Sequence, residues 1–248
     1  MKLKDKKIWI TGASSGIGEA CARSFAAEGA RLILSARRRE KLEGLAEKIR
    51  ADGGLCEIAV VDVSDRTAME ALGISLAEKG GVDILINNAG TMPISPIISG
   101  RVDEWERMID VNIKGVLYAI HAVYSGMAER KDGHIVNVSS IAARQTYPSA
   151  GVYSGTKHAV RAISDTLRKE AIRFGIRVTD VQPGSVATEL PDSIVHDKIR
   201  QAVKDNMYAD DAPILKPNDI ANSILYAITQ PAYVDVSELV IRPVIQES

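Results

Sequence analysis

The sequence has few residues that could form disulfides or hold a metal ion. It contains only two cysteines, Cys21 and Cys56, and these show no metal-ligand spacing. Its four histidines are scattered and form no HxxxH or HExxH pair. Zinc sites usually need such clusters. We therefore expect no metal site, and two free thiols of the kind found in a reducing cytoplasm.

Long hydrophobic runs and an excess of one charge are also missing. No run approaches the ~18 apolar residues of a membrane span, and the three apolar residues that end the N-terminal MKLKDKKIWI are too short a run for a signal peptide. The formal net charge of −1 gives no electrostatic reason to bind nucleic acid or an anionic membrane. We expect a cytoplasmic protein with no nucleic acid and no membrane as partner.

Short apolar runs alternate with amphipathic stretches of helical length along most of the chain. Its 248 residues are 46% hydrophobic and 25% charged, which is ordinary for a globular protein. The expected strands cover residues 7–11, 31–36, 56–62, 83–87, 133–140 and 176–184. Apolar strands that alternate with helices are typical of a parallel sheet covered on both faces.

No linker or change of composition divides the chain. We expect one α/β domain over residues 1–248, a Rossmann-type doubly wound parallel sheet of about seven strands with helices on both faces. The segment 190–217 breaks the alternation and is expected to form a small substrate lid. A helix over 218–229 and a short strand over 238–241 are expected to end the fold.

Residues 11–18 read TGASSGIG and place Gly12, Gly16 and Gly18 where the first strand leads into a helix. Ligands of an open parallel sheet bind beyond the carboxyl ends of its strands. Glycines permit close backbone approach there, and the N–H groups of a helix start favour a pyrophosphate. By itself the motif also fits a plain strand–helix turn.

The end of the second expected strand carries no acidic residue. NAD enzymes usually place Asp or Glu there to bond the ribose 2′-hydroxyl, whereas this chain has Arg37, Arg38 and Arg39. Cations suit a 2′-phosphate instead. A solvated basic helix start is the alternative, but cations at a helix N-terminus oppose its dipole. We therefore expect NADP(H) as cofactor.

Three further features complete a pattern: NNAG at 87–90, Ser140 after the fifth strand, and YSGTK at 153–157. With TGASSGIG, and in this order, they make the sequence resemble the short-chain dehydrogenase/reductase family over nearly its whole length. The resemblance implies an NADP(H)-dependent oxidoreductase that interconverts a secondary alcohol and a carbonyl by hydride transfer.

The residue types suit that chemistry, because hydride addition to a carbonyl requires a proton donor at the developing alkoxide. Lys157 lies one helical turn after Tyr153, and its charge would favour ionisation of a phenol whose ordinary pKa is ~10. By resemblance, Tyr153 transfers the proton, Lys157 also bonds the nicotinamide ribose, Ser140 steadies the carbonyl oxygen and Asn112 holds a relay water. Ser139 is a competing candidate for the serine role, and Asn112 could instead bridge backbone groups.

The resemblance also implies a set of cofactor contacts around the carboxyl ends of the strands. They are Gly12, Ser14, Ser15, Gly16, Ile17, Gly18, Arg37, Arg38, Asp62, Val63, Asn87, Ala89, Gly90, Tyr153, Lys157, Pro183, Gly184, Val186 and Thr188. For Asp62 a plain helix-start role stays open.

The substrate is less well specified by the sequence. The C-terminal YVDVSELVIRPVIQES and the segment IAARQTYP resemble NADP-dependent 3-hydroxy acid dehydrogenases, which oxidise serine or allo-threonine, and broad carbonyl reductases. The expected substrate contacts are Ser140, Arg144 and Tyr153. Arg144 could pair with a substrate carboxylate or form a salt bridge at the rim.

Two alternatives to a 3-hydroxy acid dehydrogenase stay open. One is a broad ketone and aldehyde reductase. The other is a regulatory protein that binds the cofactor without catalysis, although the presence of all four catalytic residues argues against it. By resemblance, the helices over 102–129 and 151–174 form a dimer interface, and a homotetramer or homodimer is expected.

Overall fold

A computed structural model describes residues 1–207 and 214–246. They form a seven-stranded sheet of order β3-β2-β1-β4-β5-β6-β7 in which every pairing is parallel. The strands are β1 (Lys7–Thr11), β2 (Arg31–Ala36), β3 (Leu55–Val60), β4 (Ile84–Asn87), β5 (Gly133–Val138), β6 (Ile176–Pro183) and β7 (Glu238–Ile241). The prediction of a Rossmann-type parallel sheet is confirmed.

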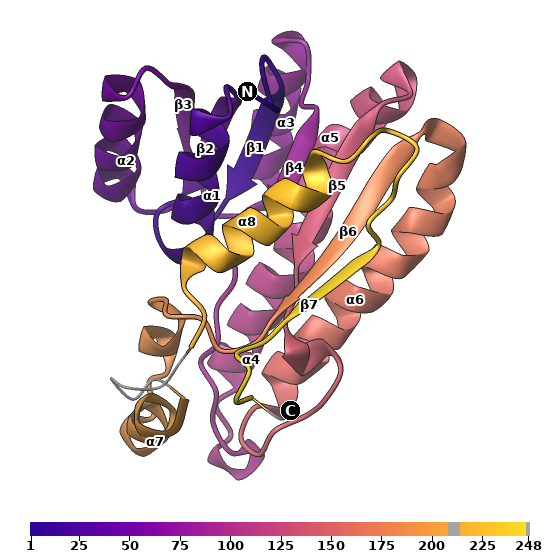
Figure 1. Ribbon diagram of the computed structural model, residues 1–248. Coiled ribbons are helices and arrows are strands. Elements are labelled where there is room, and N and C mark those ends of the chain that lie inside the picture. The colour runs from indigo at the N-terminus through magenta and orange to yellow at the C-terminus, as the bar shows by residue number, and fades with distance from the viewer. Residues whose placement is uncertain (208–213, 247–248) are drawn as a thin grey trace.

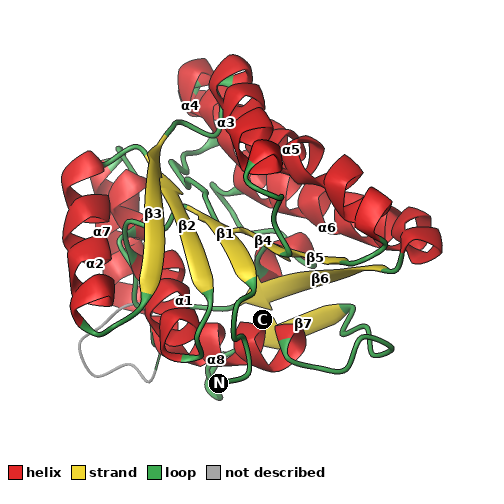
Figure 2. Ribbon diagram, turned by 90° about the horizontal axis from the view of Figure 1, so that it is seen from above, coloured by secondary structure: helices red, strands yellow, loops and turns green. Residues whose placement is uncertain are grey.

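Helices cover both faces of this sheet (Figure 2). They are α1 (Gly16–Ala27), α2 (Arg39–Ala51), α3 (Arg66–Glu78), α4 (Val102–Ile109), α5 (Gly115–Arg130), α6 (Gly151–Ala171), α7 (Asp197–Met207) and α8 (Pro217–Ile228). One face packs against α1, α2 and α8, and the other against α3, α5 and α6.

The strands are apolar throughout because alternate side chains enter two different cores. In β1, Ile8 and Ile10 pack with Phe25 of α1, while Trp9 packs on the opposite face with Met127 of α5. All five side chains are fully buried. Complete burial of a side chain of this size contributes about 1.5–3 kcal/mol, so both faces of the strand stabilise the fold.

The expected helix over 102–129 is interrupted by a π-helical turn, Asp110–Lys114, between α4 and α5. The backbone keeps helical dihedral angles through Asp110 and Gly115, so α4 and α5 follow one another without a loop. Such turns are rare and often occur at functional sites. This one contains Asn112.

The carboxyl ends of the strands lie at the edge of the molecule where α4 and α7 are found (Figure 1). In the expected lid, 190–217, the structure places a short 3₁₀ turn, Leu190–Ser193, and then α7. Residues 208–213 of that segment lie outside the described part of the chain.

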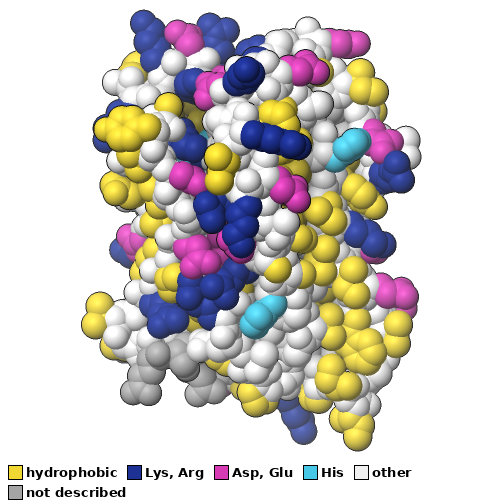
Figure 3. Space-filling model, turned by 90° about the vertical axis from the view of Figure 1, so that its right-hand side faces the viewer, with side chains coloured by type: hydrophobic (Ala, Val, Ile, Leu, Met, Phe, Trp, Pro, Cys, Tyr) yellow, Lys and Arg dark blue, Asp and Glu magenta, His cyan; other side chains and the backbone are white. Residues whose placement is uncertain are grey.

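The surface carries charges of both signs. On the face drawn in Figure 3, Lys and Arg side chains are interleaved with Asp and Glu, and hydrophobic side chains gather toward its lower right. Among the described residues, no helix has the length and apolarity that crossing a membrane requires. The same residues contain no group of three or more His, Cys, Asp or Glu side chains that could hold a metal ion.

Candidate active site

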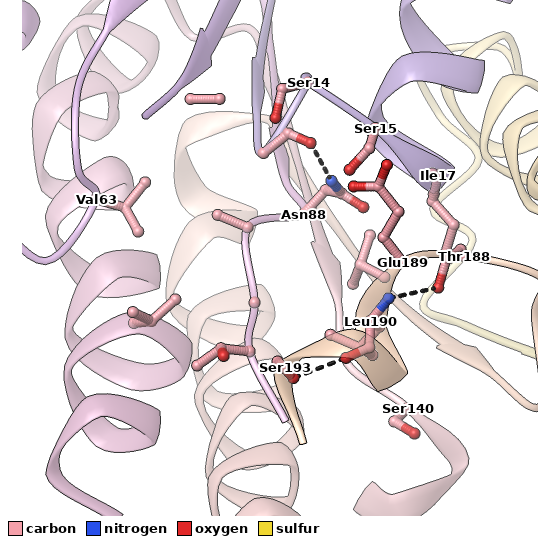
Figure 4. Close-up of a pocket in the computed structure, with 18 of the residues that line it drawn as sticks. Ser14, Ser15, Ile17, Val63, Asn88, Ser140, Thr188, Glu189, Leu190 and Ser193 are labelled. Atoms are coloured by element: carbon pink, nitrogen blue, oxygen red, sulfur yellow. Dashed lines mark hydrogen bonds between the residues drawn. The ribbon is translucent and has the colours of Figure 1, made fainter. Parts of the chain in front are cut away.

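A cavity of about 380 Å³ lies at the carboxyl ends of the strands (Figure 4). Most of the predicted site residues line it: Gly12, Ser14, Ser15, Gly16, Ile17, Arg37, Arg38, Asp62, Val63, Ala89, Gly90, Ser140, Tyr153, Lys157, Pro183, Gly184, Val186 and Thr188. Four predicted site residues do not: Gly18, Asn87, Asn112 and Arg144. The volume is within the usual range for a small-molecule site.

The glycine loop is held close to the segment after β4. Gly12 has φ +65°, and a Cβ there would lie 2.8 Å from the Ala89 Cα atom. A Cβ on Gly18 would lie 2.4 Å from the Gly12 carbonyl oxygen, so Gly18 allows the close packing of α1 without facing the cavity. A larger residue at either position would force the backbone apart.

Asn88 joins these two segments, a role that the sequence did not predict. Its Nδ2 donates to the carbonyl oxygens of Thr11 (3.1 Å) and Gly12 (3.2 Å). The Thr11 hydroxyl accepts from the backbone N–H groups of Asn88 and Ala89. Asn87 is buried instead, and its Nδ2 donates to Asn137 Oδ1 at 2.9 Å. The only signal in the sequence was the second asparagine of NNAG.

The end of the cavity next to β2 is rich in cations. Arg38 donates to the hydroxyls of Ser14 (2.9 Å) and Ser15 (2.6 Å), which anchors its guanidinium on the glycine loop. Arg37 Nη1 lies 3.7 Å from Asp62 Oδ2. The N-terminal turn of α1 starts at Gly16, and the side chain of the preceding residue, Ser15, does not cap it. N–H groups and fixed cations of this kind fit a dinucleotide phosphate.

Arg107 of α4 also lines this part of the cavity and was not predicted. Its Nη2 donates to Asp62 Oδ2 at 2.9 Å and its Nη1 to Ser64 Oγ at 3.0 Å. Burial alone would raise the pKa of Asp62, but the hydrogen bonds from Ser64 and Arg107 outweigh it and hold the pKa below its usual value. Asp62 is therefore an ionised acceptor in the wall of the cavity.

Helix α6 carries Tyr153 and Lys157, and both side chains are buried. The Lys157 Nζ atom lies 5.8 Å from the centroid of the Tyr153 ring and donates to the Val138 carbonyl oxygen at 3.0 Å. Burial lowers the pKa of Lys157 to about 8, and nearby Asp180 opposes that effect. A lysine that titrates near neutral pH beside a phenol is suited to proton chemistry.

Ser139 and Ser140 both line the cavity, but their hydroxyls differ in what they contact. Ser139 donates to the Val181 carbonyl oxygen in β6 at 3.3 Å. Ser140 Oγ accepts from the Ala142 backbone N–H at 3.1 Å, which leaves its own O–H able to donate. This difference favours Ser140 over Ser139 for the serine role.

Asn112 is buried and bonded to protein groups. Its Oδ1 accepts from the Thr91 N–H at 2.9 Å, and its Nδ2 donates to the Thr91 carbonyl oxygen (3.0 Å) and to Thr156 Oγ1 (3.1 Å). The structure therefore shows the backbone-bridging arrangement, which the sequence had left open beside the water-holding role.

Arg144 is the predicted substrate contact that the structure places elsewhere. Its Nε donates to Gln182 Oε1 and its Nη2 to Glu238 Oε2, and Glu238 also accepts from Arg161 at 3.1 Å. The guanidinium is directed to β6 and β7, outside the lining of the cavity. Of the two alternatives for Arg144, the structure contains the salt bridge, because Glu238 is brought to it only by the β6–β7 pairing.

The family model for short chain dehydrogenases matches residues 6–199. The chain belongs to the short-chain dehydrogenase family. The predictions of this family and of an oxidoreductase are confirmed by that match and by the curated relatives. This short-chain dehydrogenase is 44% identical to an uncharacterized oxidoreductase of Staphylococcus saprophyticus over 244 residues, which cover 97% of each chain.

Solved structures of similar proteins include complexes with NADP. A closed form of serine dehydrogenase in complex with NADP⁺ has a TM-score of 0.89 and 36% identity, and covers 98% of this chain and 96% of that one. An alcohol dehydrogenase from Thermococcus sibiricus, in complex with 5-hydroxy-NADP, has a TM-score of 0.87 and 29% identity, with 99% of each chain covered.

Proposed function

We propose that this short-chain dehydrogenase uses NADP(H) to interconvert a secondary alcohol and a carbonyl compound. The observation that carries the cofactor assignment is the cation at the end of β2, where Arg38 is fixed by Ser14 and Ser15 beside the glycine loop. An NAD enzyme usually has an acidic residue there. The NADP bound to its structural neighbours supports the same choice.

The side chains of the site transfer the proton and bind the carbonyl oxygen of the substrate. When bound, NADPH supplies a hydride to the carbonyl carbon, and NADP⁺ takes it up in the reverse direction. Tyr153 donates its phenolic proton to the carbonyl oxygen as the C–O double bond becomes single, which balances the reduction. Ser140 donates a hydrogen bond to that oxygen, and the ammonium of Lys157 stabilises the tyrosinate left behind. Asn112 positions this region by joining Thr91 to Thr156.

A 3-hydroxy acid is the proposed substrate, supported by similarity to two serine dehydrogenase structures at 36% and 35% identity. A neutral ketone or aldehyde is the second candidate, because Tyr153 packs in an apolar cluster with Ile94, Met108 and Ile194. An apolar surround favours an uncharged substrate over a carboxylate.

The reaction is tested by following NADPH and NADP⁺ absorbance with serine, other 3-hydroxy acids, neutral secondary alcohols, ketones and aldehydes. Tyr153→Phe is expected to reduce kcat by about 10²–10⁴-fold while cofactor binding persists. Turnover that survives this change refutes the proton-transfer role, and tighter binding of NADH than of NADPH refutes the cofactor choice. Arg144→Ala is expected to affect hydroxy acids and neutral alcohols equally, and a selective loss with hydroxy acids would restore Arg144 as a carboxylate contact.

We also propose that residues 1–248 act as one domain with a substrate lid over 190–217, in the cytoplasm, as a homotetramer or homodimer. Exposed apolar side chains on the α4–α5 face, including Ile109 and Leu117, support an interface there. Light scattering after size exclusion tests it: Leu117→Asp is expected to shift the mass toward the monomer. A wild-type monomer would refute the oligomer.

A further inference from the structure

An acidic side chain forms ion pairs with the cationic side chains next to the glycine loop. Glu189 follows the β6 segment that lines the cavity, and its carboxylate accepts from Arg38 Nη1 at 2.7 Å and from Lys41 Nζ at 2.6 Å. Figure 4 shows this carboxylate beside Ser15. The two hydrogen bonds hold the pKa of Glu189 down to about 2. The carboxylate is therefore charged throughout the neutral range.

Arg38 donates to Glu189 in addition to its bonds to the hydroxyls of Ser14 and Ser15. Its guanidinium is thus fixed from the glycine loop on one side and from Glu189 on the other. Lys41 lies one turn into α2, three residues after Arg38, so both cations face the same carboxylate. Two converging cations with an anchored guanidinium form a receptor for a bidentate anion such as a carboxylate or a phosphate.

We propose that the Glu189 carboxylate occupies the phosphate receptor formed by Arg38 and Lys41, and that the 2′-phosphate of NADP(H) displaces it. This inference rests on the proposed function, because it assumes the NADP(H) assignment. It adds Lys41 as a phosphate-binding residue and makes Glu189 a determinant of cofactor selectivity. A cofactor without the 2′-phosphate has no group to exchange for Glu189 and leaves the ion pairs in place.

The neighbouring charges provide a matched control. Arg39, next to Arg38 in sequence, pairs with Glu43 at 3.4 Å on the exposed side of α2. Glu43→Gln removes one negative charge beside the cations of α2, as Glu189→Gln does, but it leaves Arg38, Lys41 and their bonds to Glu189 untouched. It separates a local exchange from a general change in the potential of this surface.

The test measures binding of 2′,5′-ADP and of ADP by isothermal titration calorimetry to wild type, Glu189→Gln, Lys41→Met and Glu43→Gln. Glu189→Gln is expected to bind 2′,5′-ADP about three- to tenfold more tightly, because half-exposed ion pairs contribute modestly, and to change ADP binding less than about twofold. Lys41→Met is expected to weaken the binding of 2′,5′-ADP by a similar factor. Glu43→Gln is expected to change neither nucleotide.

Weaker or unchanged binding of 2′,5′-ADP by Glu189→Gln overturns the inference, since Glu189 would then close over the bound nucleotide or have no influence on it. An equal gain for both nucleotides, or an equal effect of Glu43→Gln, also overturns it. A wild type that does not prefer 2′,5′-ADP to ADP overturns the NADP(H) assignment and the inference together. A wild type that prefers 2′,5′-ADP while Glu189→Gln has no effect removes the inference alone.

Discussion

Replacing Lys157 with methionine is expected to make the protein more stable at neutral pH and inactive. Lys157 is buried, and burial lowers its pKa from 10.5 to about 8. At 1.36 kcal/mol for each pKa unit, the charged side chain costs the folded state about 3 kcal/mol. Methionine has similar length and no charge, so it removes that penalty.

The variant also loses favourable contacts of Lys157. The hydrogen bond to the Val138 carbonyl oxygen contributes about 1 kcal/mol, and the contact with the Tyr153 ring about 0.5 kcal/mol. The net expectation at pH 7 is a gain of about 1–2 kcal/mol in the free energy of unfolding. Activity is expected to vanish, because the tyrosinate loses its cation.

Urea unfolding at several pH values between 7 and 10.5 measures this difference. Because the folded pKa lies below the unfolded value, folded Lys157 binds fewer protons than unfolded Lys157 between pH 8 and 10.5, and wild-type stability rises across that window. The advantage of Lys157→Met should therefore shrink and then reverse toward pH 10.5, where the wild type keeps the hydrogen bond to Val138 with little charge penalty. Lys169→Met, which removes an exposed lysine paired with Asp165 on the same helix, is the control and should cost less than about 1 kcal/mol.

A Lys157→Met protein that is less stable than wild type at pH 7, or a difference that does not vary with pH, would refute this reasoning. The first result would mean that the lost contacts outweigh the desolvation of the charge. The second would mean that Lys157 has the same pKa in the folded and unfolded chains.

Three further predictions concern burial and backbone geometry. His134 is buried, and desolvation lowers its pKa to about 3. The free energy of unfolding of the wild type should therefore fall by about 2–3 kcal/mol from pH 7 to 4.5. His134→Gln should lessen this fall in thermal unfolding, and an unchanged pH dependence would contradict the lowered pKa of His134. Gly18→Ala should destabilise by about 1–3 kcal/mol, because its Cβ would meet the Gly12 carbonyl oxygen. Gly44→Ala, inside α2 with open space around it, should stabilise by about 0.5–1 kcal/mol, and equal effects of the two changes in urea unfolding would count against the steric argument. Burial raises the pKa of both thiols, but only Cys21 is fully buried. Cys21 should therefore react with a thiol reagent only on unfolding, whereas the partly buried Cys56 should react in the folded protein, and simultaneous labelling of both would show otherwise.

Local sequence patterns predicted the parts of the site that a single segment builds. TGASSGIG and YSGTK each combine residues within one or two turns of backbone, so their spacing alone places Gly12 near Gly16 and Tyr153 one turn from Lys157. Both segments line the cavity. Arg107 lies in a segment with no recognisable motif, and Glu189 directly follows the predicted contact Thr188. Both were missed because their partners are distant in the sequence and meet them only through tertiary packing.

The assignment of Arg144 shows the same limit. Its charge was visible in the sequence, but its partner was not, since Glu238 lies 94 residues further along the chain. Asn112 was correctly placed in a long helical stretch, yet the π-helical turn around it and its bonds to Thr91 and Thr156 depend on how α4 and α5 pack against α6.

The sequence by itself determined the alternation of apolar strands and amphipathic helices, the glycine loop and the order of the catalytic motifs, because these follow from backbone periodicity and short-range spacing. Only the tertiary structure decided which charges meet: Glu189 with Arg38 and Lys41, Arg107 with Asp62, and Arg144 with Glu238. It also decided the pKa of Lys157, because burial is a property of the packed protein and not of any one segment. Ion pairs and desolvation depend on distances across the fold, which local pattern does not carry.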